Sequence, residues 1–166
     1  MKYLFCFVAL SFGTNTNHNC SRSCRESFET FVPWSKLRTV VERTKRTILS
    51  EHKSRALPGL PFVCSRITQI YDEGACVYFY FCMAVNFNGA LDPRDVFGEI
   101  EASARREILN NGGSLSHHHG IGKLRSSFVP EIYSDGYLDS INAVKTALDP
   151  VNVFGARNGV FAGKPC

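Results

Sequence analysis

The 166-residue sequence lacks any hydrophobic run long enough to cross a membrane, and it lacks internal repeats and low-complexity tracts. Hydrophobic residues make up 44% and charged residues 20%, which excludes a disordered or collagen-like chain. The net charge is only +4, the Lys and Arg residues are scattered, and aromatic residues are not interleaved among them. We therefore expect no nucleic-acid-binding surface.

The seven cysteines include no CxxC pair, and their number is odd. Both features argue against a complete disulfide framework. Cys76 and Cys82 lie within one apolar segment, where cysteine acts as a small buried hydrophobic residue. We expect reduced thiols and an intracellular protein.

The N-terminal residues have the outline of a short signal peptide, because Lys2 precedes an apolar run at 3–10. Asn19-Cys20-Ser21 matches the N-glycosylation pattern. A misassigned start of a longer protein is the alternative that we favour, because everything after Arg25 resembles the middle of a larger chain. We expect residues 1–24 to lie outside the fold and residues 25–166 to form one domain.

Hydrophobic periodicity predicts three strands and three helices. Strands are predicted at 27–32, 62–71 and 75–87. One helix begins at Ser35. A second begins at Pro93, after Asp92, and ends at Asn111-Gly112-Gly113. A third covers 138–148. This order predicts an α+β fold, an antiparallel sheet with helices on one face, followed by a C-terminal helical segment.

Residues 75–87 have the clearest pattern. The odd-numbered positions are all apolar, whereas the even-numbered positions include Tyr78, Tyr80 and Asn86. Since neighbouring side chains of a strand point to opposite faces, one face is expected to pack on a core and the other to be polar. Tyrosines in strands most often serve packing, and a free phenol is a poor base at neutral pH unless cations or imidazoles change its environment.

Residues 114–125 (SLSHHHGIGKLR) are the densest functional candidate. No carboxylate occurs between Ile108 and Pro130, while Lys123 and Arg125 are both present. A glycine-rich loop with cations and imidazoles suits an anion, because backbone N–H groups and positive charge act together.

The histidines of this loop have three interpretations: a solvated loop, a metal site, and a contact to a bound ligand. A metal site needs converging ligands. In an extended loop His117 and His119 would share a side and His118 would face the other way, and no carboxylate is close in sequence to support them. We therefore expect no metal site.

Several segments together resemble the C-terminal region of the alkylglycerone-phosphate synthases. They are ESFET at 26–30, PW at 33–34, GACVYFYF at 74–81 and NGGSLSHHHGIGKL at 111–124. DPVNVFG at 149–155 resembles the closing motif of the wider FAD-linked oxidase family. The resemblance covers residues 25–158, and its triple-histidine loop is the most specific part.

The resemblance implies a FAD enzyme without net oxidation. It would exchange the acyl group of 1-acyl-glycerone 3-phosphate for a long-chain fatty alcohol, in ether lipid biosynthesis. Tyr78 would be the acid/base, and His117, His118 and His119 would lie beside the flavin. We add Lys123 and Arg125 as weaker candidates for phosphate or flavin contacts. Tyr78 and the three histidines should converge on the flavin ring.

Some features depart from the resemblance. No segment matches the FAD-binding domain or the arginine for the substrate phosphate, so the chain would be part of a cap domain that needs a FAD-binding half. The family implies a peroxisomal location, but no peroxisomal signal is present. A homodimer and peripheral membrane association stay open. The alternatives are a FAD-linked 2-hydroxyacid dehydrogenase and an inactive truncated or secreted product.

Overall fold

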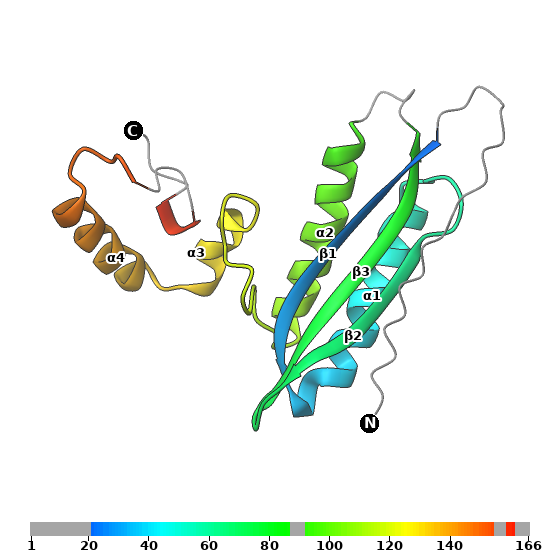
Figure 1. Cartoon of the computed structure of the whole chain (residues 1–166), viewed down its shortest axis with the longest axis horizontal. Helices are drawn as coiled ribbons and strands as arrows, with labels where there is room; N and C mark the ends of the chain where they lie inside the picture. Colours follow the sequence, from blue (N-terminus) through cyan, green and yellow to red (C-terminus); the bar gives the residue numbers. More distant parts are fainter. Residues whose placement is uncertain (1–20, 87–91, 155–158, 162–166) are drawn as a thin grey trace.

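A computed structural model describes residues 21–86, 92–154 and 159–161 of the chain. A three-stranded antiparallel sheet has two long helices on one face, and an arm of shorter helices extends beside this sheet–helix unit (Figure 1). The strands lie in the order β1 (Ser21–Pro33), β3 (Gly74–Asn86), β2 (Phe62–Ile70). The α+β fold that the sequence predicts is confirmed.

The central strand β3 gives the sheet two different faces. Val77, Phe79 and Phe81 are at most 1% exposed and point toward the helices. Phe28 of β1 lies directly opposite Phe79, and their rings stack with centroids 5.3 Å apart. Tyr78 on the other face is only partly buried. The alternation predicted for this strand is confirmed. Among the described residues, no helix packs on the polar face of the sheet.

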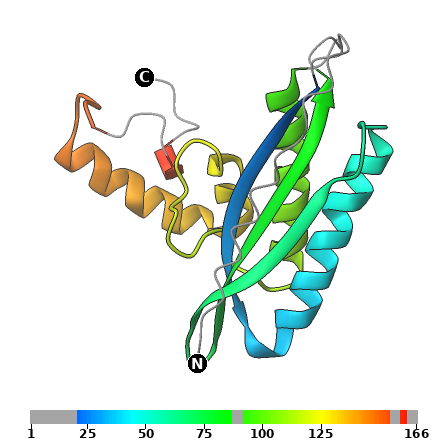
Figure 2. The same cartoon turned by 45° about the vertical axis from the view of Figure 1, so that its right-hand side comes forward.

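Helices α1 (Leu37–Ser54) and α2 (Pro93–Asn110) cover the core face of the sheet (Figures 1 and 2). Each buries one mainly apolar stripe of side chains at helical spacing. The ring of Phe97 stacks on Phe81 of β3 with centroids 4.1 Å apart. Burial of each such side chain stabilises the fold by about 1.5–3 kcal/mol. The main helical contributions come from Val40, Ile48, Ile100, Ala104 and Ile108.

The end of α2 directs the chain past the outer edge of β1. Gly112 has a φ of +86°, and the N–H of Gly113 donates to the carbonyl of Ile108 at 2.9 Å, which closes the helix with a left-handed residue. A Cβ at position 113 would lie 2.5 Å from Ile108 Cγ2 and 3.0 Å from Thr30 Oγ1. Glycine therefore lets the chain pass close to β1.

The arm contains η2 (Ser126–Phe128), α3 (Val129–Ile132), α4 (Asp135–Leu148) and η3 (Gly159–Phe161). Both views show it to one side of the sheet–helix unit (Figures 1 and 2). Helix α4 buries none of its residues. None of the helices among the described residues is both long and apolar enough to cross a membrane.

Several boundaries differ from the prediction. Strand β1 begins at Ser21, so residues 21–24, which we expected outside the fold, belong to it. A 3-10 turn, η1 (Trp34–Lys36), precedes α1, and no side chain caps that helix, so the predicted cap at Ser35 is wrong. Helix α4 begins at Asp135 because the hydroxyl of Ser134 accepts the N–H of Tyr137. The signal-like run and most of the glycosylation motif lie outside the described residues.

Candidate functional site

The open face of the sheet, opposite the two long helices, carries a row of three functional groups. The strand register pairs Glu29 of β1 with Tyr78 of β3, and Tyr78 with Arg66 of β2. Because directly paired residues point to the same face, a carboxylate, a phenol and a guanidinium lie side by side. Cys76 precedes Tyr78 by two positions and shares this face.

The histidine loop (residues 114–120) reaches the open face because its first residue is attached to β1. The N–H of Ser114 donates to the carbonyl of Phe31 at 2.9 Å, and the Ser114 hydroxyl accepts the N–H of Phe31 at 2.9 Å. The Thr30 hydroxyl donates to the Ser114 carbonyl at 2.7 Å. The loop therefore starts as an extension of the sheet edge, which fixes where the histidines lie.

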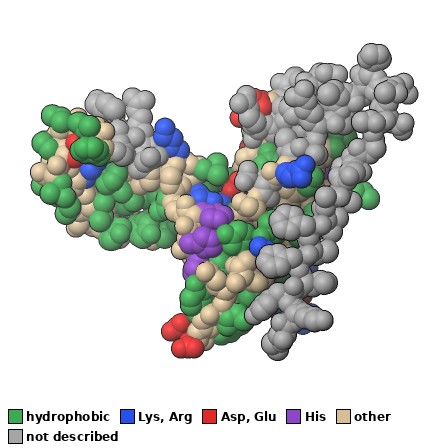
Figure 3. Space-filling view, viewed as in Figure 1, with side chains coloured by type: hydrophobic (Ala, Val, Ile, Leu, Met, Phe, Trp, Pro, Cys, Tyr) green, Lys and Arg blue, Asp and Glu red, His purple; other side chains and the backbone are tan. Residues whose placement is uncertain are grey.

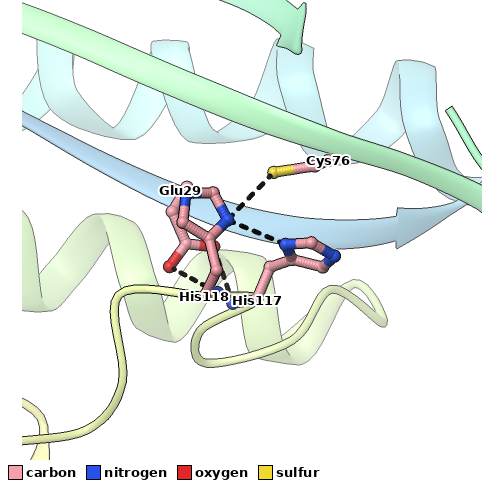
Figure 4. Close-up of side chains that lie close together, drawn as sticks. All are labelled: Glu29, Cys76, His117 and His118. Atoms are coloured by element: carbon pink, nitrogen blue, oxygen red, sulfur yellow. Dashed lines mark hydrogen bonds between the residues drawn. The ribbon is translucent and has the colours of Figure 1, made fainter. Parts of the chain in front are cut away.

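Glu29 holds the histidine loop from the sheet side (Figure 4). Its carboxylate accepts the Ser116 hydroxyl at 2.7 Å and the backbone N–H groups of His117 at 2.6 Å, His119 at 3.0 Å and His118 at 3.4 Å. The side chain of Glu29 is fully buried. One carboxylate thus fixes the backbone of all three histidines.

The electrostatics of Glu29 show how tightly it is bound to the loop. Burial alone would raise the pKa of Glu29, but the hydrogen bonds from the Ser116 hydroxyl and the three backbone N–H groups outweigh it and lower the pKa from 4.5 to about 2. This difference corresponds to roughly 3 kcal/mol in favour of the ionised carboxylate. A buried carboxylate without these donors would be strongly unfavourable, so the loop and Glu29 stabilise each other.

Tyr78 and the three histidines form one line of hydrogen bonds. The Tyr78 hydroxyl lies 2.6 Å from His118 Nε2 and 2.9 Å from His119 Nε2, and His118 Nδ1 lies 2.8 Å from His117 Nδ1. The convergence of phenol and imidazoles that we expected is present. The predicted alternation of the histidine side chains is wrong, because the loop bends and is not extended.

The three hydrogen bonds of this line can all form between an uncharged phenol and uncharged imidazoles. In one assignment of hydrogens, His119 Nε2–H donates to the Tyr78 oxygen, and the phenol O–H donates to His118 Nε2. His118 Nδ1–H then donates to His117 Nδ1. No donor faces a donor in this arrangement. The four side chains are therefore connected for proton transfer without any buried charge among them.

The pKa of Tyr78 is raised by partial burial and by the negative charges that Cys76 and Glu29 can carry, while Arg66 acts in the opposite direction. Imidazoles of the loop do lie beside the phenol, but its surroundings favour the protonated form. The phenol therefore starts as a proton donor. To act as a base it would need an imidazole that takes its own proton.

The model of the family "FAD linked oxidases, C-terminal domain" matches residues 20–158. The chain belongs to this family. It is 40% identical over 133 residues to an alkyldihydroxyacetonephosphate synthase of Caenorhabditis elegans, covering 80% of this chain and 22% of that protein. It is 30% identical over 131 residues to the synthase of Dictyostelium discoideum, covering 78% of this chain and 20% of that protein.

The chain thus spans about a fifth of the length of the curated relatives that it matches. A solved structure of an alkyldihydroxyacetonephosphate synthase is similar with a TM-score of 0.52 and 23% identity, covering 77% of this chain and 19% of that one. This structural likeness shows that the fold is shared.

Within this FAD-linked oxidase domain, the two cations suggested for anion binding have different surroundings. Lys123 is exposed. Arg125 is 8% exposed, and its Nη1 donates to the carbonyl of Gly120, the last residue of the histidine loop, at 2.6 Å. From α2, Arg105 donates to the carbonyl of Leu115 at 3.1 Å. Both arginines hold the loop, and a role of Lys123 or Arg125 in substrate binding stays a prediction.

Sequence reasoning missed Glu29 and Arg66, and it considered Cys76 only for packing. Its argument against a metal considered only neighbours in the sequence and an extended loop. No carboxylate is close in sequence to the histidines, but the folded chain brings Glu29, 88 positions away, to the N–H of His117. Two histidines also converge, and ligand atoms of Glu29, Cys76, His117 and His118 all lie within 4.8 Å of one another (Figure 4).

The open face suits the ring of a flavin, the cofactor that the family name implies. The rings of Tyr78 and Tyr80 stack with centroids 5.9 Å apart, and the guanidinium of Arg66 lies 5.4 Å from the Tyr80 ring centroid. His118 and His119 are exposed beside them. Histidine side chains are visible where the arm meets the sheet–helix unit (Figure 3). Aromatic faces, N–H donors and a cation match a flat ring that carries hydrogen-bond acceptors.

Proposed function

We propose that this domain supplies the proton-transfer groups of an alkyldihydroxyacetonephosphate synthase. The reaction replaces the acyl group of 1-acyl-glycerone 3-phosphate with a long-chain fatty alcohol and releases a fatty acid. The likeness to the curated synthases supports the proposal. The structural observation that carries it is the Tyr78 hydroxyl, which lies within 2.9 Å of two imidazoles on an open face of the sheet.

In this proposal Tyr78 exchanges a proton with the reacting carbon of the substrate. Its hydroxyl begins protonated because its pKa is raised. His118, at 2.6 Å, is placed to take the phenol proton while the phenol oxygen removes one from the substrate. Glu29 does not react, because it is fully buried and its oxygens already accept hydrogen bonds from the loop.

FAD, when bound, supplies an electron-accepting ring against which the carbon skeleton reacts without net oxidation. Tyr78, His118 and His119 are the side chains of this domain that would lie against the ring. Arg66, exposed on the same face and paired with Tyr78, would offer a positive charge to a phosphate of substrate or cofactor.

A chimera tests this function. The matching segment of the C. elegans synthase is replaced by this chain, and the conversion of 1-acyl-glycerone 3-phosphate and a labelled fatty alcohol to the alkyl product is measured. We expect exchange activity in the chimera. Tyr78→Phe should lower the rate by about 10²–10⁴-fold, because it removes the transferable proton but keeps the ring. The flavin absorbance of the purified variant should be unchanged.

Tyr137→Phe is the matched control, since this phenol lies on the arm and is 46% exposed. It should leave the exchange rate as it is. A flavin-loaded Tyr78→Phe chimera with the rate of the unmodified chimera would remove Tyr78 from the reaction and the main support of the proposal with it.

A further inference from the structure

The cluster beside Tyr78 contains three atoms that take no part in the proposed transfer, although one of them belongs to His118, whose Nε2 faces the phenol. We propose that Cys76 Sγ and the Nδ1 atoms of His117 and His118 bind a thiophilic divalent cation of the zinc class. The site goes beyond the proposed function, because it needs neither flavin nor substrate.

The geometry is close to that of a tetrahedral site. The two Nδ1 atoms lie 2.8 Å apart, and Cys76 Sγ lies 3.9 Å from His118 Nδ1. Zinc bonds of about 2.0–2.1 Å to nitrogen and about 2.3 Å to sulfur would place these pairs roughly 3.3 Å and 3.5 Å apart. Each of these two separations therefore changes by about half an ångström or less when an ion enters, and the remaining pair, Cys76 and His117, starts within 4.8 Å. Rotation of the imidazoles about their own bonds supplies such a shift without moving the loop backbone.

The donor set selects the class of ion. One thiolate and two imidazoles favour zinc and chemically similar ions over magnesium or calcium, which prefer oxygen ligands. Three protein ligands leave a fourth position for water. Glu29 supports the site from below, because its carboxylate already accepts the N–H groups of both ligating histidines and adds negative charge nearby.

The ion would interrupt the line of hydrogen bonds at His118. A single hydrogen between the two Nδ1 atoms now joins His117 to His118, and the cation takes its place. With the ion on Nδ1, the hydrogen of His118 must sit on Nε2, which points at the Tyr78 oxygen 2.6 Å away. His118 then donates to Tyr78 and no longer accepts its proton. Bound metal and proton transfer from Tyr78 to His118 therefore exclude each other.

Cobalt and zinc titrations of the 166-residue chain under reducing conditions test the site. Co²⁺ should give a thiolate-to-cobalt charge-transfer band in the near ultraviolet, which added Zn²⁺ removes at one equivalent. Mg²⁺ should have no effect. Cys76→Ser should lose the band and weaken zinc binding roughly a hundredfold or more. Cys82→Ser is the matched control on the same strand and the same face, and it should keep both.

Two further variants make the test independent of any single substitution. His117→Asn should also weaken binding, and Glu29→Gln should weaken it by about 10–100-fold as a positioning residue. Far-ultraviolet circular dichroism checks that each variant keeps its fold. A folded Cys76→Ser chain with an unchanged cobalt band would place the metal at another cysteine and overturn the proposal, as would a wild-type chain that binds no zinc. Neither result depends on the transfer reaction, so the two proposals can fail separately.

Discussion

The sheet–helix unit and the α4 part of the arm differ in how far they bury their apolar side chains. In the unit, Phe79 of β3 and Ile100 of α2 are fully buried. In the arm, Leu148 of α4 is 82% exposed and Phe154 is 76% exposed, although α4 has a regular amphipathic stripe. An apolar hollow of about 440 Å³ opens between α4, Phe154 and Phe161.

The difference teaches that an amphipathic helix is stabilised by the surface it meets and not by its pattern alone. Glu29, Cys76 and Tyr78 are all carried by strands of the sheet–helix unit, and the histidine loop is attached to the same unit through Phe31. The geometry of the site should therefore be insensitive to α4. The following substitutions test this separation.

The largest effect is expected from Phe79→Ala. Phe79 is fully buried between Phe28 and the helices, so the truncation leaves a cavity and should cost about 3–5 kcal/mol of unfolding free energy. Leu148→Ala on the arm is the matched truncation and should change it by less than about 0.5 kcal/mol. Urea denaturation followed by circular dichroism measures both. Equal losses would mean that the arm and the unit fold as one body.

A second, smaller effect is expected on the pH dependence of the unfolding free energy, to which Glu29 contributes. Its pKa is lowered to about 2, so its contribution is complete above pH 4.5 and is lost as the pH falls from 4.5 toward 2. Glu29→Gln should lower the unfolding free energy by about 2–3 kcal/mol at pH 7 and by little near pH 2. The unfolding free energy of the variant should therefore fall less steeply than that of the wild type between pH 4.5 and pH 2. Denaturation at several pH values measures this.

The exposed carboxylate of Glu42, which pairs with Arg38 on the surface of α1, supplies the control for Glu29. Glu42→Gln should change the unfolding free energy by less than about 0.5 kcal/mol at any pH. If the unfolding free energy of Glu29→Gln fell with acid as steeply as that of the wild type, the carboxylate would not hold the loop.

The smallest effect is expected from Ser134→Ala, which removes the hydroxyl that accepts the N–H of Tyr137 at the start of α4. The loss should be about 0.5–1 kcal/mol and confined to the arm. Hydrogen exchange should become faster across Asp135–Leu148 and stay unchanged across Leu37–Ser54. Faster exchange in both helices would contradict the separation of the two regions.

Local patterns were sufficient to predict most of the fold. The alternation in β3 depends only on neighbouring residues, and α2 is delimited by Pro93 at its start and the glycine pair at its end. The start of α4 was placed too late because its first turn is polar and only the cap at Ser134 marks it. Composition and alternation pointed to the histidine loop and to the polar face that carries Tyr78, and the family resemblance gave these residues their expected roles.

Glu29 could not be found in this way, because its partners lie 87–90 positions away in the sequence. One physical signal was available. Glu29 is the single charged residue between Phe28 and Val32, a segment that is otherwise apolar except for Thr30, and burying a charge there requires several hydrogen-bond donors. The search for those donors would have led to the acid-free loop.

The line that joins His119, Tyr78, His118 and His117 has no fixed polarity. Turning every hydrogen round, so that His117 Nδ1–H donates to His118 and the phenol donates to His119, satisfies the same three contacts. The two arrangements make the same three hydrogen bonds. They therefore suit a reaction cycle in which one step takes a proton from the protein and a later step returns it. Such a cycle ends with the protein in the state in which it began.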